Sequence, residues 1–254
     1  MSLREIKVVL IESGGDIDEQ LCDQIDAGGG EAFLVGRTAS HIGILADKYG
    51  WGFSAVNPAE GEQLSLALAN AEGVLGGANV AVVLTQVFLP EEPRIGGADS
   101  QKIVSNWLST TLAVVRNCAP LFYSEGGLIL LVCAGAVTKK PTESKAVASR
   151  EAAIDGWIRT MSLKYASKAI RINAIVAEPI ECSSGVGRWH LSHASEASLR
   201  THFKQSRSEL VDIAKVVCWL ASPEANWMTG QTIKVAGCLP SEKILSESLG
   251  YPTP

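Results

Sequence analysis

Residues 6–25 read "IKVVLIESGGDIDEQLCDQI", and this stretch decides the class of fold. A continuous apolar run, typical of a buried β-strand, leads into two glycines and then a helical pattern. The apolar residues of that helix recur at one-turn spacing: Ile17, Leu21 and Ile25. A strand, a glycine turn and a helix usually form the place where a dinucleotide's pyrophosphate binds. Here, however, the turn carries the acids Glu12, Asp16 and Asp18.

The same alternation of apolar strand and amphipathic helix continues along the chain. Strands are expected at 6–11, 31–36, 52–56, 80–85, 128–133, 170–176 and 231–236, and helices at about 17–28, 41–49, 60–72, 101–118, 148–167 and 208–221. Apolar strands separated by helices indicate a parallel sheet covered on both faces. The predicted fold is therefore a doubly wound, Rossmann-type α/β domain of about seven strands. No linker is apparent, so residues 1–254 form one domain, with 239–254 as its C-terminal tail.

Composition excludes several classes of function. Apolar residues make up 46% and charged residues 19% of the chain, and the net charge of −5 gives no sign of a nucleic-acid or membrane partner. The start shows no signal-peptide pattern, so a cytoplasmic location is expected. The six cysteines lack metal-ligand spacing and most lie in apolar runs, which predicts buried, reduced thiols. His190 and His193, with Cys182 upstream, lack a further ligand pair, so we expect no metal site.

Two of the predicted helices carry apolar residues on more than one face. In 101–118 these include Trp107 and Leu112, and in 148–167 they include Trp157 and Met161. A helix that covers a sheet needs only one apolar stripe. A second stripe predicts contact with another subunit, and the tryptophans favour that interpretation over the alternative of a thick core.

The C-terminal third resembles the short-chain dehydrogenase/reductase family, and the order of elements extends this resemblance over nearly the whole chain. The segment "EAAIDGWIRTMSLKYASKAIRINAIVAEPIE" (151–181) is similar to the family's active-site helix and following strand. The segment "SELVDIAKVVCWLASPEANWMTGQTIKVAGC" (208–238) is similar to its last helix and last strand. The resemblance implies a dehydrogenase fold that binds a nicotinamide cofactor.

The resemblance also locates the family's catalytic serine, tyrosine and lysine, and none of them is present. Their positions correspond to Ala134, Val147 and Glu151. In the family the tyrosine moves the hydroxyl proton, while the lysine one turn later lowers the tyrosine's pKa and holds the nicotinamide ribose. A glutamate in place of that lysine reverses the sign of the tuning charge. No residue is therefore assigned a catalytic role. Tyr165 and Lys168, near the end of the same helix, are interpreted as structural.

The cofactor loop is altered as well. The family's TGxxxGxG loop corresponds to 11–18, where Gly14 remains in the turn but Glu12, Asp16 and Asp18 replace the motif glycines. Glycine lets backbone N–H groups approach the pyrophosphate closely. A carboxylate adds bulk and like charge, which costs about 3 kcal/mol per pair at about 5 Å and an effective dielectric constant of about 20. We therefore expect this chain to bind no cofactor, with NAD held by a partner subunit.

These residues favour one hypothesis and leave two others open. The leading one is a non-catalytic subunit that supports the assembly of an active, NAD-dependent hydroxyacyl-CoA or similar alcohol dehydrogenase. The expected partner is a homologous active subunit in a hetero-oligomer, and the resemblance implies a tetramer because family members are typically tetramers. One alternative is a small-molecule or nucleotide sensor on the same fold. The other is an active oxidoreductase with relocated catalytic residues.

Overall fold

The computed structural model describes residues 2–11, 16–84, 98–134, 141–177, 180–181 and 208–235. Within them lies a seven-stranded, wholly parallel sheet with the order β3-β2-β1-β4-β5-β6-β9. Its strands are β1 (Lys7–Ile11), β2 (Glu31–Gly36), β3 (Gly52–Ala55), β4 (Val80–Leu84), β5 (Gly127–Ala134), β6 (Ile170–Ala177) and β9 (Thr232–Val235). The predicted doubly wound α/β fold is confirmed, and each predicted strand is present to within one residue at either end.

The strand order places the first strand in the middle of the sheet. From β1 the chain runs outward to β3, returns to β4 on the other side, and continues to the opposite edge at β9. Val8 of β1 therefore pairs with Ala32 of β2 on one side and Val80 of β4 on the other. The central strands are apolar on both faces because helices cover both faces.

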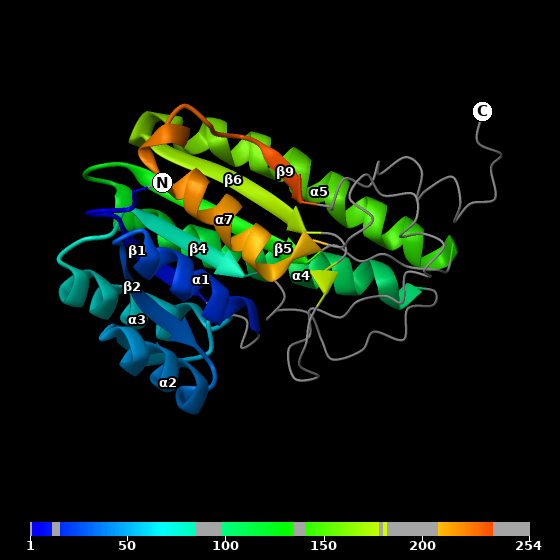
Figure 1. The fold of residues 1–254 in the computed structure, drawn as a ribbon. Helices are drawn as coiled ribbons and strands as arrows, with labels where there is room; N and C mark the ends of the chain where they lie inside the picture. The colour runs from blue at the N-terminus through cyan, green and yellow to red at the C-terminus, as the bar shows by residue number, and fades with distance from the viewer. Residues whose placement is uncertain are drawn as a thin grey trace.

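Among the described residues, six helices form two layers, one on each side of the sheet (Figure 1). One layer contains α1 (Asp16–Ala27), α2 (Ala39–Tyr49) and α7 (Leu210–Ala221); the other contains α3 (Gly61–Leu75), α4 (Ala98–Cys118) and α5 (Pro141–Tyr165). Each layer encloses its own hydrophobic cluster against the sheet. Short 3₁₀ turns follow three of the helices: η2 (Ala119–Phe122), η3 (Ala166–Lys168) and η4 (Pro223–Ala225).

The helix bounds differ from the expected ones mainly at the start of α5. This helix begins at Pro141, seven residues before the predicted start at 148, whereas the other predicted helices begin within three residues of their expected starts. Proline suits the first turn of a helix because its φ is already helical and it needs no hydrogen-bond partner there. The structure also has a short parallel pair, β7 (Ile180–Glu181) with β8 (Ser208–Glu209), that was not expected. The segment 182–205 and the tail 239–254 lie outside the described residues.

The remaining sequence expectations concern thiols, metals and membranes. Four cysteines are confirmed as buried thiols: Cys22, Cys118, Cys133 and Cys218. Burial raises the pKa of the Cys118 thiol to about 12, which makes it unreactive near neutral pH. No cluster of three potential metal ligands occurs among the described residues, while Cys182, His190 and His193 lie outside them. No helix in the described part of the chain has the length and apolar character needed to span a membrane.

Candidate functional site

The expected catalytic positions lie toward the carboxyl edge of the sheet. Ala134 is the last residue of β5, while Val147 and Glu151 lie one turn apart in the first half of α5. Figure 1 shows the first parts of α4 and α5 extending past the arrowheads of the central strands, on the side where parallel α/β folds bind ligands. Ala134 and Val147 carry no proton that could be transferred. The positions that the resemblance assigns to the family's catalytic residues therefore lie on the expected elements, while their side chains lie outside the described residues.

The side chain of Asp18 lies where its position in the sequence did not predict. It lies in the first turn of α1, is fully buried, and its carboxylate Oδ2 is 3.3 Å from Nε2 of His41 on α2. The charge expected to face a phosphate thus faces the neighbouring helix instead. The side chain of Asp18 still adds bulk, however, at a position where the family has its third glycine. That glycine allows close packing of this helix. Asp16 begins α1, whereas Glu12 and Gly14 lie outside the described residues.

A second set of contacts joins α1 to α2 further along both helices. The Tyr49 hydroxyl donates to Oδ1 of Asp23 at 2.5 Å, and Lys48 bridges Asp23 and Glu19 at 3.2 and 2.9 Å. The hydrogen bond from Tyr49 lowers the pKa of Asp23, and Lys48 adds to that effect. Burial, followed by the bond to Asp23, raises the pKa of Tyr49 to about 12. These contacts hold α2 against α1, the helix that follows the altered loop in the sequence.

The four residues expected at an interface differ in burial. Met161 is 8% exposed and belongs to the core layer beneath α5, while Trp157 is half-buried and packs against that same layer. Leu112 on α4 is also half-buried, and the side chain of Trp107 lies outside the described residues. Burial within one chain does not test contact with a partner, so this assignment stays a prediction.

The solvent side of α5 is formed by other residues, which we call the α5 outer face. It consists of exposed residues about one turn apart: Ala152, Gly156, Thr160 and Leu163. Leu163 is 79% exposed, and a side chain added at Gly156 would meet nothing within 4 Å. Nearby Arg159 forms an exposed ion pair with Asp155 at 3.0 Å. Three of these four residues are small, which would let another helix approach closely.

Comparison with known proteins settles the family. A family model described as "Enoyl-(Acyl carrier protein) reductase" matches residues 57–239, well over half of the chain. This protein is a short-chain dehydrogenase/reductase. The human protein "Dehydrogenase/reductase SDR family member 2, mitochondrial" is 26% identical over 219 residues, which cover 82% of this chain and 69% of that protein. Among the curated relatives the match spans 40% to 69% of their length.

Solved short-chain dehydrogenase/reductase structures share the fold. The 3-ketoacyl-(acyl-carrier-protein) reductase of Brucella melitensis, solved with NADH, has a TM-score of 0.76 at 16% identity, covering 93% of this chain and 98% of that one. A short chain oxidoreductase of Pseudomonas aeruginosa PAO1, described as containing an atypical catalytic center, has a TM-score of 0.71 at 17% identity, covering 95% and 99%. At these identities the likeness concerns the fold alone.

The short-chain dehydrogenase/reductase motif residues that remain in β6 hold the C-terminal part of the fold. The Arg171 guanidinium donates to three backbone carbonyls, those of Leu220, Ala225 and Met228, at 3.1 to 3.3 Å. Asn173 is fully buried, donates to the carbonyl of Met228 at 2.9 Å and accepts from the backbone of Gln231 at 3.0 Å. The resemblance located these residues but not their partners, which lie about 50 residues away along the chain.

Tyr165 and Lys168 belong to the frame of the fold. Tyr165 is 7% exposed, sits in the core layer, and burial raises the pKa of its hydroxyl. Lys168 lies over the ring of Tyr123 with its ammonium 5.4 Å from the ring centre. Both residues lie where α5 meets β6, far along the chain from Val147 and Glu151. Their surroundings support the structural interpretation, since neither contacts the carboxyl edge of the sheet.

Proposed function

We propose that this chain is a non-catalytic short-chain dehydrogenase/reductase subunit that associates with an active, NAD-dependent dehydrogenase subunit and supports its assembly. The observation that carries the proposal is a complete family fold in which Ala134, Val147 and Glu151 stand where the family uses serine, tyrosine and lysine. A chain that has the family fold but lacks these catalytic residues fits a role in which another subunit performs the reaction.

The proposal includes the absence of a bound cofactor in this chain. Asp18 fills the place of a motif glycine with a buried carboxylate, and Glu151 puts a negative charge where the nicotinamide ribose would need a lysine. The residues present therefore do not fit NAD or NADP. Calorimetric titration of the isolated chain is expected to give no binding heat at millimolar cofactor. A dissociation constant in the micromolar range would contradict this part of the proposal.

The α5 outer face is the first surface we assign to the partner, together with the adjoining side of α4 and the edge strand β9 with its tail. Leu163 offers an exposed apolar side chain, and Gly156 leaves open space beside it. If a partner helix packed here, burial of the Leu163 side chain would contribute about 2 kcal/mol to association. An active homologous subunit is the expected occupant, in a heterotetramer.

The association test compares two exposed leucines. Leu163→Glu on the α5 outer face is expected to separate the subunits, because a buried unpaired charge is strongly unfavourable. Leu66→Glu is the matched control, since Leu66 is 72% exposed on α3 in the same layer. After co-expression with the candidate partner, light scattering should show a smaller species for the first variant only. Equal assembly of both variants would remove α5 from the interface.

Trp157 gives a second, more demanding test. Trp157→Glu is expected to abolish the complex while circular dichroism shows the chain still folded, since buried aromatic anchors commonly contribute 2 kcal/mol or more. Because Trp157 packs against the core layer, unfolding of this variant would assign the residue to the core instead. The Leu163 variant then decides the question alone, because its side chain lies almost fully in solvent.

For the specific complex, we propose an NAD-dependent hydroxyacyl-CoA dehydrogenase or a similar alcohol dehydrogenase. The pattern of a degenerate subunit is similar to heteromeric members of the family, among them the 2-[hydroxy(phenyl)methyl]-succinyl-CoA dehydrogenase of anaerobic toluene degradation. The test is to co-express this chain with an active relative that retains the family's serine, tyrosine and lysine. Oxidation of the hydroxyacyl-CoA by the complex, but not by this chain alone, is the expected result.

An active oxidoreductase with relocated residues is the second candidate. It is favoured by the similarity to a human protein named as a dehydrogenase/reductase. The two candidates differ in one measurement. Cofactor-dependent reduction of a ketone by the purified chain alone would support the second candidate and exclude the first.

A further inference from the structure

A hollow that the family's chemistry does not use lies at the amino edge of the sheet, where β4, β5 and β6 begin. It is a cavity of about 600 Å³, a volume within the range of small-molecule sites. A second cavity of about 480 Å³ adjoins it and shares Ile6, Asn79 and Glu125. We call the first one the amino-edge cavity. It lies at the opposite end of the strands from Ala134, so it is separate from the altered catalytic positions.

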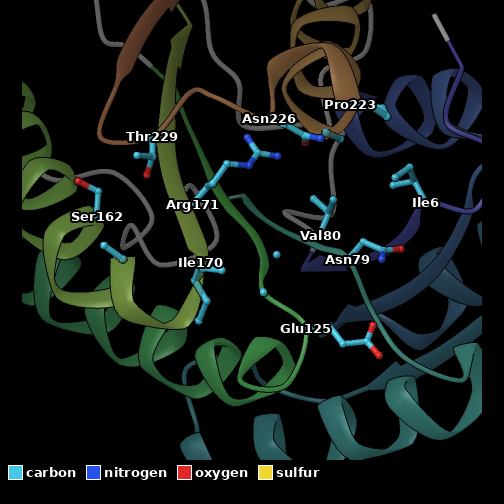
Figure 2. Close-up of a pocket in the computed structure, with 15 residues that line it drawn as sticks. Ile6, Asn79, Val80, Glu125, Ser162, Ile170, Arg171, Pro223, Asn226 and Thr229 are labelled. Carbon is cyan, nitrogen blue, oxygen red and sulfur yellow. The ribbon is translucent and has the colours of Figure 1, made fainter.

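Opposite charges stand at the two ends of the amino-edge cavity. Figure 2 shows Arg171 with Asn226 and Thr229 at one end, and Asn79 with Glu125 at the other. Val80 and Ile170 add apolar surface to the lining. Past Glu125, the adjoining cavity is lined by two further carboxylates, those of Glu5 and Glu31, and by one ammonium, that of Lys7, so its charge remains negative. The amino-edge cavity and the adjoining cavity are therefore together cationic at one end, acidic at the other and partly apolar between the two ends.

Polar groups at both ends retain hydrogen-bonding capacity. Arg171 has five N–H donors, of which three are used by the backbone carbonyls, and it forms no ion pair with any carboxylate in the described part of the chain. Asn79 accepts a bond from the backbone of Lys7 through Oδ1, which leaves its amide N–H₂ group available. No hydrogen bond joins the side chain of Asn226 or Glu125 to another described residue.

We propose that the amino-edge cavity binds a small zwitterion, with a carboxylate directed to Arg171 and Asn226 and an ammonium directed to Glu125. The apolar middle fits a short aliphatic chain between these groups. A simple anion would gain from Arg171 but would be repelled by the acidic end, and a simple cation would meet the reverse problem. This site does not depend on the proposed function, because the isolated chain contains every residue it needs.

Three probes of equal length test the charge pattern in the full chain by calorimetry: 6-aminohexanoate, hexylamine and hexanoate. We expect 6-aminohexanoate to bind with a dissociation constant below about 1 mM, and each single-charge probe to bind at least tenfold more weakly, which corresponds to about 1.4 kcal/mol. If none of them binds, or if a single-charge probe binds as tightly as the zwitterion, the proposal is overturned.

Two variants test the assigned ends. Glu125→Gln removes the acidic end and Asn226→Asp places a negative charge at the carboxylate end, and each is expected to weaken 6-aminohexanoate at least tenfold. Both residues are exposed, so the fold should persist. Glu62→Gln is the matched control, because Glu62 is exposed in the first turn of α3 and lines neither cavity. Unchanged affinity in either test variant, or an equal loss in the control, would also overturn the proposal.

Discussion

The region of β6, α7 and β9 and the region of β5 and early α5 have kept different parts of the same family pattern. In the first, Arg171 and Asn173 are still present and bind the backbone of the turn between α7 and β9. In the second, the positions that the resemblance assigns to proton transfer hold Ala134, Val147 and Glu151. On that assignment, residues that stabilise the fold are present where residues that perform the reaction are not. A chain needs fold-stabilising residues for any role, but it needs catalytic residues only for catalysis.

The largest expected effect tests whether Arg171 stabilises the C-terminal region. Arg171→Met removes three charged hydrogen bonds, which should lower the free energy of unfolding by about 3 kcal/mol or more, although the carbonyls of Ala225 and Met228 each keep one other donor. Urea denaturation measures this change. The control Arg159→Met breaks only an exposed ion pair and should cost below about 0.5 kcal/mol. Similar losses in the two variants would remove the stabilising role assigned to Arg171.

A smaller effect is expected where a family residue is restored. Asp18→Gly should lower the free energy of unfolding by about 2 kcal/mol, because it loses the contact with His41 and introduces glycine into a helix. Gln20→Gly in the same helix isolates the glycine penalty of about 1 kcal/mol. The double variant Asp16→Gly and Asp18→Gly should still bind no NAD in calorimetry. Micromolar binding would mean that the two acids alone had abolished the site.

The contacts between α1 and α2 predict a modest dependence of stability on pH. The pKa of Asp23 in the folded chain is below its ordinary value of 3.8, so its ionised form stabilises the fold. This contribution is complete above about pH 3.8 and is lost as the pH falls through the folded-state pKa. Asp23→Asn should therefore flatten the loss of stability in acid, measured as the urea midpoint between about pH 5 and 2. An unchanged slope would show that other carboxylates control this range.

The smallest effect is expected in the catalytic region. Ala134→Ser, Val147→Tyr and Glu151→Lys together should leave the reductase rate at the background of the unaltered chain. Triad residues accelerate a reaction only when cofactor and substrate are already positioned. Cofactor oxidation followed by absorbance measures the rate. A rise of a hundredfold or more would show that the cofactor site is functional, and that the two regions differ only in these three residues.

Much of this protein follows from its sequence alone. Apolar runs of four to eight residues alternating with helical periods predicted the strands and the order of elements, because a parallel sheet covered on both faces requires that pattern. The resemblance of 151–181 to the family, counted back from Gly156, assigned the catalytic positions to Ala134, Val147 and Glu151, and chemistry alone says that alanine and valine transfer no proton. The start of α5 at Pro141 was missed, because the apolar period becomes regular only further along the helix.

Only the tertiary structure decided where individual side chains point. Asp18 faces His41 because α2 packs beside α1, a contact between residues 23 positions apart that no local pattern contains. Met161 turns into the core while Leu163 faces solvent, since the sheet lies under one side of α5. The carbonyls bound by Arg171 lie 49 to 57 residues away, and the amino-edge cavity forms from several separate segments. The apolar periodicity of the sequence predicts which residues lie in the same helix or strand. The packing of the helices and strands determines which side chains contact one another.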